Sequence, residues 1–134
     1  MPTFENPAAD ADEAQQSLRG LAHATRSIND PQDIYPTLGS LSRAAASMSQ
    51  SLHQLASFHD EPARTTGWAP EDSAGARSAA YRVSWELHRA GEMLRQVAAT
   101  IDHAHEAEAI LAYHREFPEH SRTVSPGPDH RIGL

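Results

Sequence analysis

The chain has 134 residues, 39% of them hydrophobic and 22% charged, and this length allows a single domain with one core. It contains no cysteine, which excludes disulfide scaffolds, thiolate metal sites and cysteine nucleophiles. The formal net charge of −7 at pH 7 argues against nucleic-acid binding through a broad basic surface. Because no stretch approaches the roughly 20 apolar residues of a membrane helix and no signal-peptide pattern is present, we expect a soluble cytoplasmic protein with no membrane contact.

A short amphipathic helix is predicted from about residue 10 to residue 28. Its apolar positions alternate by four and three residues, at Ala14, Leu18, Leu21, Thr25 and Ile28. Residues 1–9 are predicted to be a flexible N-terminus. Pro31 separates this helix from the next one, because proline lacks the backbone N–H that a helix interior requires.

A second helix is predicted over Ile34–His59, with a heptad seam. The seam consists of Ile34, Leu38, Leu41, Ala45, Met48, Leu52, Leu55 and His59. Between Tyr35 and His59, Arg43 is the only residue charged at neutral pH, and serine and glutamine fill many outer positions. Small side chains let another helix approach closely, so we interpret this serine-rich face as a second packing surface used for dimerisation. An ordinary solvated face is the alternative.

The third predicted helix, Ser73–Glu116, is the longest. Its seam consists of Ala76, Ala80, Val83, Leu87, Ala90, Leu94, Val97, Ile101 and Ala104, with the polar Glu108 next and then Leu111. Asp72 or Ser73 is placed to cap its start, and Phe117-Pro118 to end it. Residues 118–134 lack apolar periodicity and are predicted to be a flexible C-terminal tail.

Together these elements predict an all-α domain over residues 10–117. The two long helices form an antiparallel hairpin, and the shorter N-terminal helix completes a three-helix bundle with a long third helix. Helix two would be about 39 Å long and helix three about 66 Å, so part of the third seam lacks a cover in one chain. We therefore expect a homodimer or a bend in helix three, with Leu52, Leu94 and Ile101 among the interface residues.

Histidines and carboxylates are densest late in the third helix. The candidate metal ligands there are Asp102, His103, His105 and Glu106. No Glu-x-x-His motif is present, and the neighbouring faces are expected to be exposed. A solvated polar face is therefore the favoured interpretation, and no cofactor is predicted.

A second line along the third helix contains aromatic residues. It consists of Tyr81, Trp85, His88 and Glu92, at spacings of four and three. One interpretation is a binding strip for a partner helix. The other, which we favour, is a widened core stripe packed against the first helix.

Arg82 and Arg89 share a face of the third helix and offer a contact for a phosphate backbone. Intrahelical pairs with Glu86 and Glu92 explain these arginines without a nucleic acid, so an accessory DNA-binding role is a minor alternative.

No nucleophile with a base and no glycine-rich phosphate loop is found, so the sequence favours a non-enzymatic protein–protein interaction module, with a metal-binding bundle as the alternative. The segments Thr3 to Asp12 and Val83 to His88 give the chain a resemblance to short uncharacterised actinobacterial helical proteins. Such proteins are found with conjugative or mobile-element genes. The resemblance implies an accessory role in DNA transfer or replication, and it implies no catalytic residue.

Overall fold

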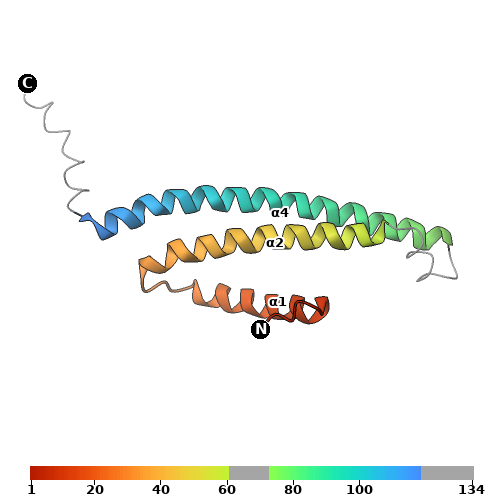
Figure 1. Cartoon of the computed structure of the whole chain (residues 1–134), viewed down its shortest axis with the longest axis horizontal. Helices are drawn as coiled ribbons and strands as arrows, with labels where there is room; N and C mark the ends of the chain where they lie inside the picture. The colour runs from red at the N-terminus through yellow and green to blue at the C-terminus, as the bar shows by residue number, and fades with distance from the viewer. Residues whose placement is uncertain (61–72, 119–134) are drawn as a thin grey trace, which may run out of the picture. The chain divides into compact units, whose positions relative to one another are not determined.

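The computed structural model describes residues 1–60 and 73–118, and this part of the chain contains helices and no strand (Figure 1). The elements are α1 (Pro7–Ala24), a 3-10 turn η1 (Pro31–Asp33), α2 (Ile34–His59) and α4 (Ser73–Glu116). Residues 1–33 form one compact unit and the chain from Ile34 onward forms a second. The predicted C-terminal tail lies outside the described residues, apart from Pro118.

Helix α1 begins at Pro7, three residues before the predicted start. The Asn6 side chain accepts a hydrogen bond from the backbone N–H of Ala9 at 3.1 Å, so Asn6 caps the helix. Pro7 then fits the first turn, where no intrahelical donor is needed. The Asp10 carboxylate accepts the backbone N–H of Thr3 at 2.7 Å, which draws the preceding segment onto the helix.

The remaining helix boundaries are predicted from capping residues and prolines, and most of these predictions agree with the structure. Helix α1 ends at Ala24 instead of residue 28, and a short turn leads from it to Pro31. The predicted bounds of α2 and α4 are confirmed. Pro36 is accommodated because it lies in the first turn of α2.

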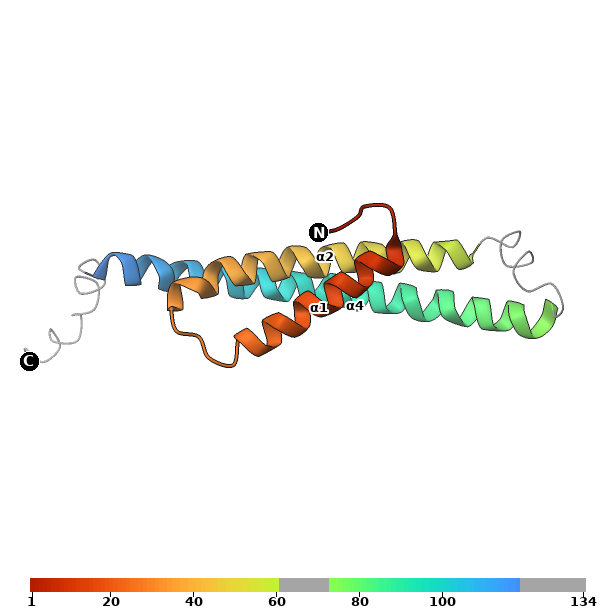
Figure 2. The same ribbon diagram turned by 90° about the horizontal axis from the view of Figure 1, so that it is seen from below.

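Helices α2 and α4 lie side by side and run antiparallel (Figures 1 and 2). Ser42 contacts Ala98, and further along α2 Ser49 contacts Gly91, so the numbering falls along α4 as it rises along α2. The two long helices therefore form the predicted hairpin.

Small residues occupy the centre of the contact between α2 and α4. They form two lines with a spacing of seven: Ser42, Ser49 and Ala56 on α2, and Ser84, Gly91 and Ala98 on α4. All six are buried, whereas the larger seam residues Leu52, Leu94 and Ile101 are half-buried at the border of the contact. The hairpin is thus held at a line of close backbone approach, and its large apolar side chains flank that line.

This arrangement corrects one interpretation of the serine-rich surface of α2. Two of its serines, Ser42 and Ser49, pack against α4 of the same chain. The Ser49 hydroxyl donates to the carbonyl oxygen of Gly91 at 2.6 Å, and the Ser42 hydroxyl oxygen lies 3.3 Å from the carbonyl oxygen of Ala98. Small side chains do permit close helix packing, as predicted, but the helix that approaches these two serines is α4.

Candidate interaction surface

The apolar seam of α2 lies to one side of the buried line. Leu41, Met48 and Leu55 each precede a buried residue by one position, which rotates them by about 100° from the direction of α4. Met48 is 50% exposed and Leu55 is 47% exposed. These side chains therefore point away from the contact between the helices.

The seam of α4 has the same offset. Val83, Ala90 and Val97 each precede a buried residue of α4 by one position, and Val97 is 45% exposed. In two antiparallel helices that face each other, equal offsets in residue number fall on the same side of the pair. The exposed seam residues of both helices therefore share one side of the hairpin.

We call this surface the apolar side. It comprises Leu38, Leu41, Met48, Leu52 and Leu55 of α2, with the buried Ala45 between them, together with Val83, Leu87, Ala90, Leu94, Val97 and Ile101 of α4. These residues form four neighbouring rows, two on each helix, and no polar residue lies in the rows between Leu38 and Leu55 or between Val83 and Ile101. The next position is His59 in one row of α2 and Glu108 in one row of α4. The predicted seams thus have two roles. Their half-buried residues border the contact between α2 and α4, and their exposed residues continue that apolar surface on the outside of the hairpin.

The opposite side of the hairpin has a different composition. The positions that follow the buried residues by one are Arg43, Gln50 and Ser57 on α2 and Trp85, Glu92 and Ala99 on α4, and all are exposed. Uneven polarity around a helical hairpin marks the apolar side as the surface suited to association.

The predicted aromatic strip lies toward this opposite side. Tyr81 is 74% exposed and Trp85 is 53% exposed. The Arg89 guanidinium lies 5.5 Å from the centre of the Trp85 ring. His88 turns instead toward α2, so the four residues of the strip do not act on one surface.

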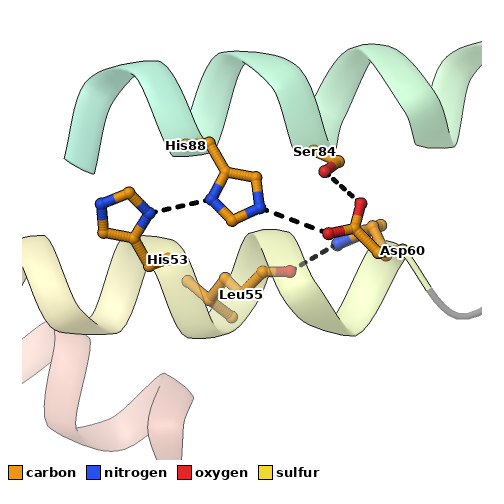
Figure 3. Close-up of polar contacts among 6 residues, drawn as sticks. His53, Leu55, Asp60, Ser84 and His88 are labelled. Atoms are coloured by element: carbon orange, nitrogen blue, oxygen red, sulfur yellow. Dashed lines mark hydrogen bonds and ion pairs between the residues drawn. The ribbon is translucent and has the colours of Figure 1, made fainter. Parts of the chain in front are cut away.

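His88 belongs to a polar cluster near the C-terminal end of α2 (Figure 3). The Nδ1 atoms of His53 and His88 are 2.8 Å apart, and Nε2 of His88 is 3.3 Å from Oδ2 of Asp60. The hydroxyl of Ser84 donates to the other carboxylate oxygen of Asp60. The cluster links Asp60, the residue that directly follows α2, to Ser84 and His88 on neighbouring turns of α4.

The directions of these hydrogen bonds follow from their acceptors. A carboxylate only accepts, so Nε2 of His88 carries the hydrogen that faces Asp60. Nδ1 of a neutral His88 is then an acceptor, and Nδ1–H of His53 donates to it. Gly91 leaves room for this ring, since a Cβ at Gly91 would lie 2.7 Å from Nε2 of His53.

The same cluster lacks the geometry of a nucleophilic site. The hydroxyl of Ser84 is bonded to a carboxylate and no imidazole nitrogen accepts its proton, whereas activation of a serine requires a base at the hydroxyl. The hydrogen bond from Ser84, followed by that from His88, lowers the pKa of Asp60 below its ordinary value. A lowered pKa keeps Asp60 ionised, so that it can accept hydrogen bonds that hold the end of α2 against α4.

The candidate metal ligands do not converge. Asp102 accepts a hydrogen bond from Ser42, and the His105 ring stacks on Tyr35 with 4.1 Å between ring centres. His103 and Glu106 are exposed. Among residues 1–60 and 73–118, no three histidine or carboxylate side chains are placed to hold a metal ion.

Two charged pairs lie along α4, and one of them involves Arg89, as the intrahelical interpretation of Arg82 and Arg89 expects. Arg95 donates to Glu92 at 2.5 Å, and this hydrogen bond lowers the pKa of Glu92. Arg89 lies 3.9 Å from Glu86. At the far end of the helix, Glu108, which interrupts the seam, is buried and accepts a hydrogen bond from Arg115.

Sequence reasoning identified the apolar seams but missed the cluster of His53, Asp60, Ser84 and His88. A signal for the contact line was present, because small residues recur every seven positions in both long helices. No local signal pairs His53 with His88, since 35 residues separate them.

Comparison of the chain with protein families, with curated proteins and with solved structures finds no match. In the described part of the chain, none of the helices combines the length and the apolar character needed to cross a bilayer.

Proposed function

We propose that this protein is a non-enzymatic interaction module whose apolar side binds a helical surface of another polypeptide chain. The observation that carries the proposal is the absence of polar residues from the four rows between Leu38 and Leu55 of α2 and between Val83 and Ile101 of α4. Exposed apolar surfaces of this extent mark association sites in soluble proteins.

The form of the surface favours a helical partner. Four parallel rows run along the hairpin, and a helix buries apolar residues at spacings of three and four against such rows. We further propose that the protein is a small cytoplasmic accessory protein of conjugative or mobile elements. This part of the proposal rests on the sequence-based resemblance.

Site-specific photocrosslinking tests the proposal. The photoreactive residue benzoylphenylalanine is placed at Val97, on the apolar side, or at the matched position Ala99, on the opposite side, in cells that naturally express the chain. We expect adducts from position 97 and none from position 99, and we expect Met48→Glu in the same chain to abolish the adduct. Equal adducts at both positions, or none at position 97, would contradict the proposal.

A further inference from the structure

The apolar side is wider than α1, the other α-helix in the part of the chain that the structure describes. The apolar side spans residues 38–55 of α2, which are 18 positions, so the surface is about 27 Å long and about 20 Å wide across two helices. These dimensions give about 540 Å² for each partner, so two copies would bury about 1,100 Å² in total, above the roughly 1,000 Å² expected of a biological interface.

Helix α1 is too small to cover this surface. It has 18 residues, or about 27 Å, and a single helix is about 10 Å wide. One helix of this size therefore covers about half of the area of the apolar side. A complete cover needs an occupant that is two helices wide and about 27 Å long.

We infer that the occupant is a second copy of this chain, which packs its apolar side against the same surface to form a four-helix core. This inference rests on the proposed function and names the partner. A second hairpin has the required length and width by identity, and a two-fold axis pairs each surface with its equivalent. Such a dimer buries the large seam residues that the contact between α2 and α4 leaves exposed.

The distribution of charge permits this assembly. Two copies with a net charge of −7 each repel one another in general. No charged residue lies in the rows of the apolar side, so no charge is desolvated at its centre. Arg43 and Glu92 are on the opposite side, where solvent screens them.

Light scattering coupled to size exclusion, at two concentrations about tenfold apart, tests the inference. The full chain has a mass of 14.6 kDa, so the expected result is about 29 kDa. The double variant Met48→Glu with Val97→Glu should elute at the monomer mass. The matched variant Gln50→Glu with Ala99→Glu adds the same charges to the opposite side and should remain dimeric.

Circular dichroism separates loss of association from loss of folding. If the Met48→Glu, Val97→Glu variant loses its helical signal, Met48→Ser with Val97→Ser replaces it, because serine removes apolar area without adding charge. A wild-type chain at 14.6 kDa at both concentrations would overturn the inference, as would dissociation of both double variants alike.

The crosslinking result distinguishes this failure from failure of the proposed function. If the chain is monomeric but still forms adducts from position 97 with a different protein, the proposed interaction surface stands and only the second copy as its partner is contradicted. If the chain is monomeric and forms no adducts, the proposed function and the inference are both contradicted.

Discussion

The buried contact line and the apolar side are one residue apart in each long helix, yet they have opposite characters. Ser49 and Gly91 meet at the contact line, whereas Met48 and Ala90 lie on the apolar side. Small residues at the line allow the backbones to approach closely, and this approach directs the bulky neighbours outward. The comparison shows that the smallest side chains decide which faces meet within the chain, while the largest define what is left for association.

The largest expected effect comes from enlarging the contact line. Ala56 is 0% exposed, so Ala56→Leu should force the helices apart and lower the free energy of unfolding by about 1–3 kcal/mol. Ala46 is exposed on the same helix, so Ala46→Leu should change it by less than about 0.5 kcal/mol. Chemical denaturation of both variants measures the difference, and equal values would contradict the close packing at Ala56.

A second pair of substitutions compares a crowded glycine with an open one. Alanine is favoured over glycine in a helix by about 1 kcal/mol, so Gly20→Ala, which meets nothing within 4 Å, should stabilise α1. Gly91→Ala should instead destabilise the hairpin, by about 1 kcal/mol, because its Cβ would displace the His53 ring. Thermal denaturation gives the two signs, and stabilisation by both would show that the ring of His53 moves aside without cost.

The smallest expected effect is the pH dependence of the stability that Asp60 contributes through the polar cluster. Because the pKa of Asp60 is lowered in the folded state, its contribution to stability is complete above the ordinary value of 3.8 and is lost as the pH falls through the folded pKa. Ser84→Ala removes the leading cause and should raise the pKa of Asp60 toward 3.8. Carboxyl NMR titration measures this, with the exposed Ser78→Ala as control. An unchanged titration in Ser84→Ala would contradict the assigned hydrogen bond.

The contrast between the contact line and the apolar side also shows which features could be predicted from the sequence. Capping residues and prolines gave the bounds of α2 and α4, because these signals act within one turn. The choice of facing surface escaped prediction because the seam of Met48 and the line of Ser49 have the same period and differ only in rotation. Periodicity ranks rows by hydrophobicity, whereas contact between two helices also depends on how closely their backbones approach.

The polar cluster lay beyond sequence reasoning for a different reason. His53, His88 and Asp60 come from separate elements, and their hydrogen bonds exist only after the hairpin forms. The missed start of α1 is the opposite case. Asn6 followed by Pro7 is a local cap signal that was available in the sequence.

The small contact line has a thermodynamic consequence. No large side chain in the described residues is fully buried, so the hairpin gains little hydrophobic stabilisation from its own two helices. Any polypeptide that covers the apolar side then contributes a substantial share of the folding free energy. By linkage, occupancy and folding rise together, and the melting temperature of the hairpin becomes a direct reporter of whether its apolar side is filled.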